Sequence, residues 1–478
     1  MSRHTRRQFL KHAAATAGVC TTCTIAGTKS SGQVLGANEV VRVGVAGIRG
    51  RGGSHIDGFA SMKGAQVTYL IDPDSSLFKS RTDAVKKRGG NEPKCVQDVR
   101  KALEDKNLDA VSIATCNHWH SLITIWACQA GKDVYVEKPC SHNVFEGRKC
   151  VEAARKYNRI VQHGTQQRSD GKRAAEIADV WAGKYGKLLV SKGYASKPRG
   201  TIGVKEPTEP PKTLDYDLWV GPAPMQPFRT NVVPYNWHWH WDFGNGEIGN
   251  QGVHQMDVAR WGIPGDTLPK SVFSFGGRYG YKDQGQTPNM QVAVFDYGDS
   301  LLVFETFGLV GKNDVPIKVQ NEFHTTEGVV REGKFYPKEG GKTHDVKVKP
   351  IHVTPGGCFG SFIACVRSRK VEEVNGEIFE AHLSAALCHL ANASYRLGKP
   401  TSFSEKPAVL GDNPQVNQSW ADMVDILKKY NVPLEGNTYQ LGPVLKFDTQ
   451  TEKFVDNDEA NKLITRKYRA PYVVPESV

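Results

Sequence analysis

The 478-residue sequence lacks three features that would place it in large classes of proteins. After residue 37 it has no apolar run long enough to cross a membrane. Its formal net charge is +12, but the basic residues are scattered among acidic ones, without a basic stripe or an aromatic RNA-binding motif. The eight cysteines after residue 37 lack paired metal-ligand spacing, and a chain of this length does not need a disulfide framework. We therefore expect no transmembrane segment, no nucleic-acid partner and no cysteine function.

The segment Met1–Ala37 differs from the rest of the chain because it carries five basic residues and no acid. Arg6 and Arg7 precede a Phe-Leu-Lys triplet and a mildly apolar run, and Leu35–Ala37 offers small residues for cleavage. A disordered basic tail is the alternative, but the paired arginines favour export. We expect a signal peptide over residues 1–37, export by the twin-arginine route, and a periplasmic or other extracytoplasmic location.

A strand-like run, Val41–Gly47, leads into a glycine-rich turn and a helix-forming stretch. This is the context that a dinucleotide fingerprint requires, since the glycines let a pyrophosphate reach the helix N-terminus, whose free N–H groups favour anions. The match is imperfect, because Arg49 occupies the second glycine position of the register. The predicted cofactor-binding residues of this turn are Gly47, Arg49, Gly50, Arg51 and Gly52.

The next predicted strand, Val67–Asp72, ends in an acid twenty residues after Gly52. A carboxylate at this place hydrogen-bonds the ribose hydroxyls of NAD and repels a 2′-phosphate. The alternative role of Asp72 is that of a turn or cap residue before Pro73. An arginine at position 49 could tolerate a 2′-phosphate, so the sequence favours NAD and leaves NADP open.

Strands and helices go on alternating to about residue 165, which is typical of a doubly wound parallel sheet. Ligands of such sheets bind outside the carboxyl ends of the strands. Polar residues follow two of the predicted strands, and we expect them beside the nicotinamide ribose and ring: Thr115, Asn117, His120 and Gln166. For His118 and His120, a position at the start of a helix is an equally good explanation.

The strand Asp133–Glu137 stops at Pro139 and leaves Glu137 and Lys138 at its carboxyl end. A partly desolvated lysine close to a cationic nicotinamide ring loses its proton easily. That suits a general acid/base which handles the proton of an alcohol while hydride leaves the carbon. Taken alone, Lys138 is more simply an exposed residue, and the motifs around it favour the functional interpretation.

Together, the glycine turn, Asp72, the Thr115-x-Asn117-x-x-His120 run and Glu137-Lys138-Pro139 resemble the Gfo/Idh/MocA oxidoreductase family, in its order and spacing. The resemblance extends to about residue 400. It implies that Lys138 is the catalytic acid/base and approaches the cofactor together with Glu137. It also implies a cis peptide bond before Pro139.

Residues 191–236 have no clear periodicity and predict a long surface excursion, which is more often functional than idle. The excursion leads to the aromatic run Asn236–Phe243, in which Trp237 and His238 are candidate substrate contacts. Aromatic faces beside hydrogen-bonding groups suit a sugar, and a hydrophobic plug over the sheet is the alternative. The histidines of this run have no acidic or cysteine partner spaced to complete a metal site, so we predict no metal.

The stretch Gly249–Trp261 predicts a helix on which Asn250 and His254 share a face. His254 matches the histidine of the family's second catalytic element, which contacts the substrate hydroxyl beside the lysine; a buried, hydrogen-bonded histidine is the alternative. In the inositol dehydrogenases of the family, the residue four earlier is Asp, and here it is Asn250. This departure removes one charge from the expected relay and leaves the substrate open.

From Ser271 onward, alternating strands predict a largely antiparallel sheet, with the helix Asn250–Trp261 packed on it. The predicted fold class is α/β: an N-terminal Rossmann-type doubly wound sheet plus a C-terminal α+β domain with a largely antiparallel open sheet. The predicted parts are the signal peptide 1–37, the NAD-binding domain 38–165, the substrate-binding domain 166–400 and a C-terminal extension 401–478. The extension has no assigned role and could brace the domains or an oligomer contact. We expect a homo-oligomer formed through the C-terminal sheet, and a subgroup resemblance to exported bacterial members.

The sequence predicts an exported NAD-dependent oxidoreductase that acts on a secondary alcohol of a sugar, cyclitol or glycoside. Lys138 exchanges the hydroxyl proton and His254 positions the hydroxyl, with Trp237, His238 and Asn250 as further substrate contacts. A second hypothesis is an NAD-dependent glycosidase that oxidises the sugar transiently with a retained cofactor, which suits an enzyme outside the cytoplasmic nicotinamide pool. The Glu-Lys-Pro element is typical of the dehydrogenases instead. A third hypothesis is a non-catalytic sugar-binding protein.

Overall fold

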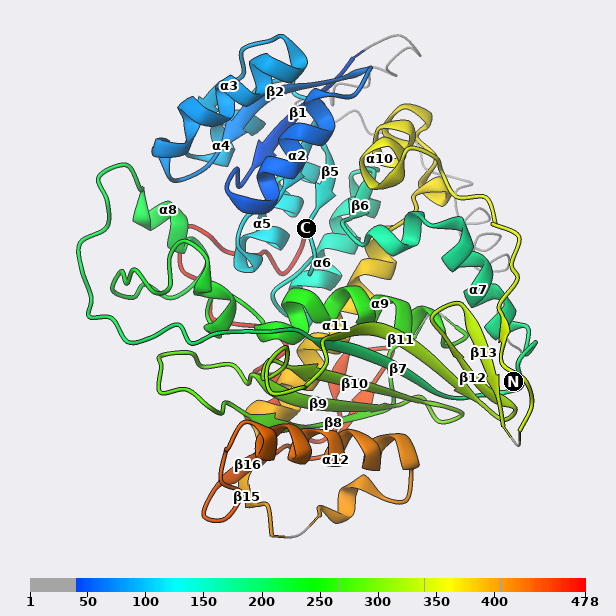
Figure 1. Cartoon of the computed structure of the whole chain (residues 1–478). Helices are drawn as coiled ribbons and strands as arrows, with labels where there is room; N and C mark the ends of the chain where they lie inside the picture. Colours follow the sequence, from blue (N-terminus) through cyan, green and yellow to red (C-terminus); the bar gives the residue numbers. More distant parts are fainter. Residues whose placement is uncertain (1–39, 266, 339, 405) are drawn as a thin grey trace. The chain divides into compact units, whose positions relative to one another are not determined.

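The computed structural model of the chain describes residues 40–265, 267–338, 340–404 and 406–478. The predicted signal peptide, residues 1–37, lies outside the described residues. Within them, two sheets with their helices make up the fold (Figure 1). None of the described helices is both long enough and apolar enough to span a membrane.

The first sheet has six parallel strands in the order β3-β2-β1-β4-β5-β6, so the order reverses between β1 and β4. Every residue of β4 and β5 is buried, as a parallel sheet covered by helices on both faces requires. The predicted doubly wound sheet is therefore confirmed. Its elements are β1 Val41–Ala46, α2 Gly50–Ala60, β2 Ala65–Ile71, α3 Phe78–Gly89, β3 Lys94–Val96, α4 Val99–Leu103, β4 Ala110–Ile113, α5 Asn117–Gln129, β5 Asp133–Val136, α6 Val144–Lys156 and β6 Val161–His163.

The second sheet has twelve strands, and its main path runs β14-β13-β12-β11-β7-β10-β9-β8-β16-β15. All its pairs are antiparallel except that of β10 with β7, so the predicted largely antiparallel sheet is confirmed. Its strands are β7 Leu188–Ser196, β8 Ser271–Gly277, β9 Met290–Asp296, β10 Leu301–Phe307, β11 Lys318–Thr325, β12 Gly328–Arg331, β13 Lys334–Pro337, β14 His344–Asp345, β15 Lys399–Ser402, β16 Thr438–Leu441, β17 Leu445–Asp448 and β18 Lys453–Phe454.

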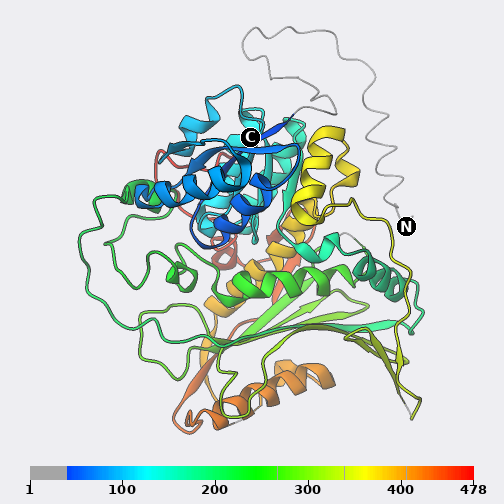
Figure 2. The ribbon, with the colours of Figure 1, turned by 45° about the horizontal axis from the view of Figure 1, so that its top comes forward.

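Different helices cover the two faces of this second sheet (Figure 2). The inner face, toward the first sheet, packs against α9 (Val253–Trp261) and α11 (Ile378–Arg396) through a core that includes Phe304 and Phe323. The outer face packs against α12 (Pro414–Lys429). The remaining helices are α7 Gly171–Trp181, α8 Tyr216–Val220, α10 Gly357–Ser368 and α13 Asp458–Asn461.

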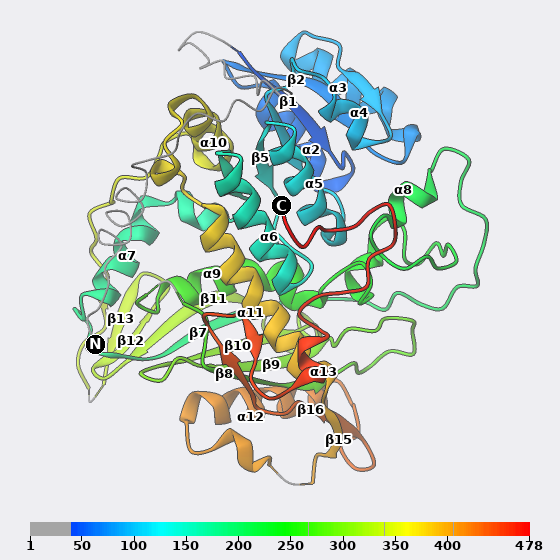
Figure 3. The ribbon, with the colours of Figure 1, turned by 180° about the vertical axis from the view of Figure 1, so that it is seen from behind.

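The C-terminal extension contacts both sheets. Its first part supplies α12 and strands β16 to β18, which belong to the second sheet. Its last residues run back along the first sheet's helices (Figure 3), where Tyr472, Val474 and Val478 are buried in the same apolar core as α5 and α6. The extension therefore braces the two halves of the described chain, which is one of the two roles that the sequence left open.

Candidate active site

A cavity of about 770 Å³ lies at the carboxyl ends of β1, β2, β4 and β5. We call its sheet side, together with the first turn leading into α9, the floor. The segment 197–236 is called the cover, because its residues complete the lining of the cavity, and residues 466–472 of the C-terminal extension hold it in place. All the predicted site residues line this cavity except Gly52: Gly47, Arg49, Gly50, Arg51, Asp72, Thr115, Asn117, His120, Glu137, Lys138, Gln166, Trp237, His238, Asn250 and His254.

The glycine turn leaves a helix N-terminus open to the cavity. Gly47 has a φ of +78°, which favours glycine, and a side chain at Gly52 would place its Cβ 1.8 Å from the carbonyl oxygen of Gly47. Gly52 thus serves close packing of α2 on the turn and not contact with a ligand. The first turn of α2 has no acidic residue, so its free N–H groups suit an anion such as the pyrophosphate of a dinucleotide.

Asp72 combines the two roles that the sequence left open. Its carboxylate accepts hydrogen bonds from the backbone N–H groups of Ile48 and Asp74, both at 2.9 Å, so it braces the glycine turn. It also lines the cavity at the carboxyl end of β2, where a ribose is expected. Arg49, at the same mouth, donates to the carboxylate of Asp74 at 2.6 Å.

Glu137 is buried between two cationic or hydrogen-bonding side chains of α2. Its Oε1 accepts from Nε of Arg51 at 2.7 Å and lies 3.0 Å from Nε2 of His55. Burial alone would raise the pKa of Glu137, but the hydrogen bond from His55 and the charge of Arg51 hold it below its ordinary value. Sequence reasoning did not single out His55, because nothing in its register on α2 distinguishes it from a core position.

Lys138 projects from the end of β5 toward the helical turn that precedes α9. Its Nζ donates to the backbone carbonyl oxygen of Asn250 at 2.7 Å. That carbonyl belongs to a π-helical turn, η4 (Ile248–Gly252), and such wider turns are frequent at functional sites. Burial lowers the pKa of Lys138, which favours a neutral amine able to accept a proton. The bond between Lys138 and Pro139 is cis, as the resemblance implied.

Polar residues after β4 mainly fix the backbone around this lysine. His120 places Nδ1 2.6 Å from the carbonyl oxygen of Pro139 and Nε2 3.0 Å from that of Thr115. Asn117 donates to the side chain of Asn245 at 3.1 Å, and Gln166 donates to the carbonyl of Gly164 at 2.7 Å. They all line the cavity, so a supporting role and a ligand contact coexist at these positions.

His254 and His238 enter the cavity as neutral rings. Burial, assisted by the charge of Lys138, lowers the pKa of His254 to about 3, and burial likewise lowers that of His238 to about 3. The ring of His238 stacks on Trp237 with centroids 3.6 Å apart, and its Nδ1 lies 2.6 Å from the carbonyl oxygen of Tyr235. In the described part of the chain, no group of three or more His, Cys, Asp or Glu residues could hold a metal ion.

The cover places apolar side chains over the cofactor end of the cavity. Leu214, Trp219, Phe228 and Val233 line it, and most of them form an apolar cluster of their own. The sequence predicted a functional excursion here but gave no sign of these four contacts. They lie far along the chain from the strands that they face, so no local pattern links them.

Backbone hydrogen bonds tie this cover to the first sheet. The N–H of Ser75 donates to the carbonyl of Thr213 and the N–H of Asp215 donates to that of Pro73, both at 2.9 Å. The C-terminal extension adds a second attachment, since Arg469 donates to the carboxylate of Asp217 at 2.5 Å and Tyr472 donates to it at 3.0 Å. Arg469 also donates to the carbonyl of Gly221 at 2.9 Å.

The Rossmann-type sheet, the open helix N-terminus and the half-buried lysine are features that nicotinamide-dependent oxidoreductases use. Residues 41–165 match an oxidoreductase family with an NAD-binding Rossmann fold, and residues 197–425 match the C-terminal alpha/beta domain of the same family. The chain therefore belongs to the Gfo/Idh/MocA oxidoreductase family, and its cofactor is NAD. The glycine turn, the anion-binding helix terminus and Asp72 fit that cofactor.

Two curated relatives represent the two activities found around this chain. The scyllo-inositol 2-dehydrogenase (NAD(+)) of Bacillus subtilis is 32% identical over 155 residues, which are 32% of this chain and 44% of that protein. The alpha-N-acetylgalactosaminidase of Shewanella oneidensis is 30% identical over 167 residues, 31% of this chain and 36% of that protein. The chain thus matches less than half the length of either relative.

Solved structures extend the likeness of the fold over more of the chain. The WlbA dehydrogenase of Bordetella pertussis, solved with NADH and UDP-GlcNAcA, superposes with a TM-score of 0.54 at 17% identity. The superposition covers 75% of this chain and 97% of that structure. At this identity the likeness concerns the fold alone.

Proposed function

We propose that this chain is an NAD-dependent oxidoreductase acting on a secondary alcohol of a sugar, cyclitol or glycoside. One observation carries the proposal: a half-buried lysine, Lys138, lines the same cavity as a dinucleotide-type glycine turn, and desolvation of its amine lowers its pKa. A neutral histidine, His254, lines the cavity with it. A base, a hydrogen-bonding partner and a cofactor cleft are the parts that alcohol oxidation requires.

The residues of the chain divide the reaction between them. NAD, when bound, supplies the hydride acceptor. The neutral amine of Lys138 takes the hydroxyl proton of the substrate, and returns it in the reverse direction. His254, kept neutral by burial, hydrogen-bonds that hydroxyl and orients it toward Lys138. The carbonyl of Asn250 and the carboxylate of Glu137 then favour the ammonium form that results.

Trp237 and His238 support a carbohydrate as the substrate. Their stacked rings line the cavity. Aromatic faces stack on the C–H faces of sugars, while ring nitrogens and amides hydrogen-bond the hydroxyls. The structure offers both kinds of group within one cavity, which also includes the side chain of Asn250.

The test is a measurement of nucleotide content followed by a substrate screen. The purified mature chain is denatured, the released nucleotide is identified, and the chain is then supplied with NAD and a panel of cyclitols, sugars and glycosides. We expect NAD binding and formation of NADH with at least one polyol. Absence of NAD binding, or ligand binding that Lys138→Ala and His254→Ala leave intact with no turnover in the wild type, would support a sugar-binding protein instead.

The attachments of the cover favour a second candidate, an NAD-dependent glycosidase that restores the hydride within each cycle. The cover is tied both to the first sheet and to the C-terminal extension, an arrangement suited to a cofactor that stays bound. Such an enzyme releases an aglycone without net NADH. Assaying aglycone release and NADH formation in the same glycoside reaction separates it from a dehydrogenase.

We also propose export by the twin-arginine route, followed by an extracytoplasmic location. The proposal is supported by Arg6, Arg7 and the absence of acids in Met1–Ala37. Replacing both arginines by lysine is expected to retain the chain in the cytoplasm, which fractionation would detect. Detection of the variant outside the cytoplasm in normal amounts would rule this route out.

A homo-oligomer through the C-terminal sheet is the last part of the proposal. Helix α12 covers the outer face over β8 to β10, so the contact is assigned to the same face of the neighbouring strands β11 and β12. Light scattering is expected to give a mass above that of one chain. A monomer in the wild type would overturn this assignment.

A further inference from the structure

A buried carboxylate, Glu247, lies one helical turn before Asn250. Glu247 is 3% exposed and immediately precedes the π-helical turn η4. Its Oε2 accepts from the side-chain Nδ2 of Asn250 at 3.0 Å, while the backbone carbonyl of Asn250 accepts from Nζ of Lys138 at 2.7 Å. Asn250 is therefore the direct link between this carboxylate and the lysine.

An arginine from the start of the cover holds the carboxylate in place. Arg199 donates from Nε to Oε2 of Glu247 at 2.9 Å and from Nη2 to Oε1 at 2.6 Å. This two-point geometry fixes both the position and the orientation of a carboxylate. The guanidinium is also 5.6 Å from the centre of the Trp239 ring, which limits its movement.

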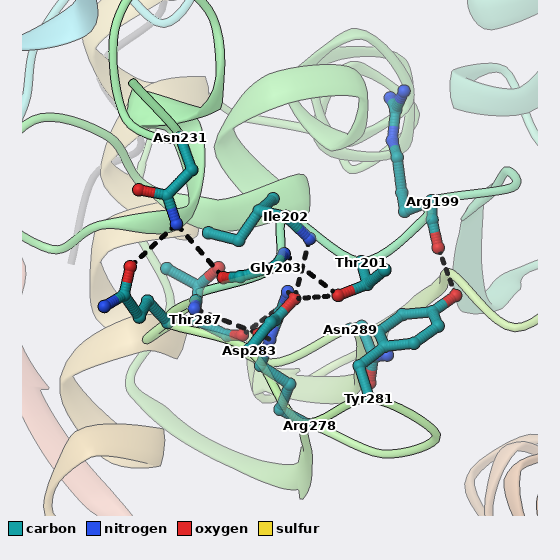
Figure 4. A network of polar contacts seen from close by, with 12 residues as sticks. Arg199, Thr201, Ile202, Gly203, Asn231, Arg278, Tyr281, Asp283, Thr287 and Asn289 are labelled. Carbon is teal, nitrogen blue, oxygen red and sulfur yellow. Dashed lines mark hydrogen bonds and ion pairs between the residues drawn. The ribbon is translucent and has the colours of Figure 1, made fainter. Parts of the chain in front are cut away.

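The backbone of Arg199 is fixed independently of its side chain (Figure 4). Asp283 accepts from the N–H of Ile202 at 2.9 Å and from the side chain of Arg278, and the hydroxyl of Tyr281 donates to the carbonyl of Arg199. In Figure 4 the guanidinium of Arg199 points away from this network. The polar network therefore serves as an anchor for the arginine that positions Glu247.

We propose that Glu247 is a positioning residue for Lys138 and Asn250, supplying the negative charge that an acid at position 250 would otherwise supply. The inference rests on the proposed role of Lys138. The inositol dehydrogenases carry Asp where this chain carries Asn250. The sequence therefore predicted that the site of this chain has one negative charge fewer beside Lys138 and His254. The structure places a carboxylate three residues earlier, joined to Asn250 by a hydrogen bond.

The charges around Lys138 are consistent with this role. Glu137 and Glu247 act to raise its pKa, whereas burial, Arg51 and Arg199 act to lower it, and His120, His163, His238 and His254 also face it. Burial raises the pKa of Glu247 itself, and Arg199, Asn250 and Lys138 oppose that rise. Arg199, which donates to both oxygens of Glu247, favours the charged form of this carboxylate.

The test measures the pKa of Lys138 directly, without a substrate. Trace acetylation of the purified chain with acetic anhydride across a pH series, read peptide by peptide by mass spectrometry, gives the pKa of Lys138, with exposed Lys101 as internal reference. Glu247→Gln is expected to lower the pKa of Lys138 by about one pH unit. The double variant Glu247→Gln/Asn250→Asp moves the charge to position 250 and is expected to restore most of the wild-type value.

Glu322→Gln is the matched control, because Glu322 is also buried and paired but lies on the outer face of the second sheet. It is expected to leave Lys138 unchanged. An unchanged pKa of Lys138 in Glu247→Gln would overturn the inference. If Glu247→Gln does not fold, the double variant Glu247→Gln/Asn250→Asp provides the test. A pKa of Lys138 far below the wild-type value in that variant would also overturn the inference. Because no substrate is used, failure here is distinct from failure to find redox turnover.

Discussion

The floor and the cover of the cavity are built on different physical principles. Floor residues stand at the ends of neighbouring parallel strands and at the start of a helix, so regular backbone hydrogen bonds fix Gly47, Asp72, Lys138 and His254. The cover has little regular structure, and it is held by separate contacts such as that of Arg469 with Asp217. From this difference we expect the floor to determine the chemistry and the cover to determine how readily the cofactor exchanges.

Lys138→Ala is expected to have the largest effect, and it tests whether the floor determines the chemistry. Lys138→Ala removes the proton acceptor and is expected to lower kcat by about 10³-fold, since general acid–base catalysis contributes on this scale. NAD content is expected to persist, because the glycine turn and the cover remain. Steady-state kinetics with the substrate found in the screen, together with nucleotide content, measure both.

Lys132→Ala is the matched control for this substitution. Lys132 is buried and lies just before β5, at the end opposite Lys138, where it donates to the carbonyl of Asp105. Its loss is expected to lower stability without a comparable loss of kcat. A Lys138→Ala enzyme with near-normal kcat would remove Lys138 from the mechanism.

The sequence predicted the individual residues of the floor, but for the cover it predicted only a functional excursion without its contacts. The physical reason is the range of the interactions. The residues after β1, β2, β4 and β5 are found from local strand patterns, because parallel strands bring their carboxyl ends to one edge. Leu214 and Trp219 reach the same cavity through contacts with residues more than a hundred positions away. No spacing rule in one sequence links such positions.

The same reasoning explains what was missed on the floor itself. His55 and Glu247 sit at ordinary helical positions, and their importance arises from partners at positions 137 and 199. The pattern around Asn250 indicated a helix but not the π-helical turn that directs its carbonyl to Lys138. These features depend on tertiary packing, which local propensity does not encode.

Buried histidines of the floor are expected to make the stability of the protein depend on pH, and His163 is the residue best suited to test this. It is fully buried at the end of β6, neither ring nitrogen has a hydrogen-bond partner within the described residues, and burial lowers its pKa to about 4. Because this pKa lies below the ordinary value of the unfolded chain, its contribution to stability is complete above pH 6.5 and is lost as the pH falls toward 4.

His163→Leu is therefore expected to reduce the loss of stability between pH 7 and pH 5 by roughly 2 kcal/mol. Urea unfolding at several pH values measures this difference. The same substitution at exposed His352 is the control, and it is expected to leave the pH dependence as in the wild type. Identical pH slopes in both variants would contradict the burial argument.

The cover is tested at its attachment to the C-terminal extension. Arg469→Ala removes the hydrogen bonds to Asp217 and Gly221 and is expected to make NAD dissociate about tenfold faster, which corresponds to about 1.4 kcal/mol. Arg155→Ala removes an ion pair with Glu377 away from the cavity and is the control. Displacement of bound NAD, followed over time, gives both rates, and equal rates would show that the attachment does not limit exchange.

The smallest expected effect concerns the choice between NAD and NADP at Arg49, Asp72 and Asp74. These residues line the cavity where the floor meets the cover. Arg49 is engaged by Asp74, and Asp72 stands beside them, so a 2′-phosphate would meet two carboxylates and an arginine that is already paired. Asp74→Ser releases Arg49 and is expected to shift the ratio of the two dissociation constants about fivefold toward NADP.

Asp83→Ser is the control. It breaks the exposed pair with Lys79 on α3 and is expected to leave the ratio unchanged. Titrations with both cofactors decide the point, and an unaltered ratio in Asp74→Ser would assign the discrimination to Asp72 alone.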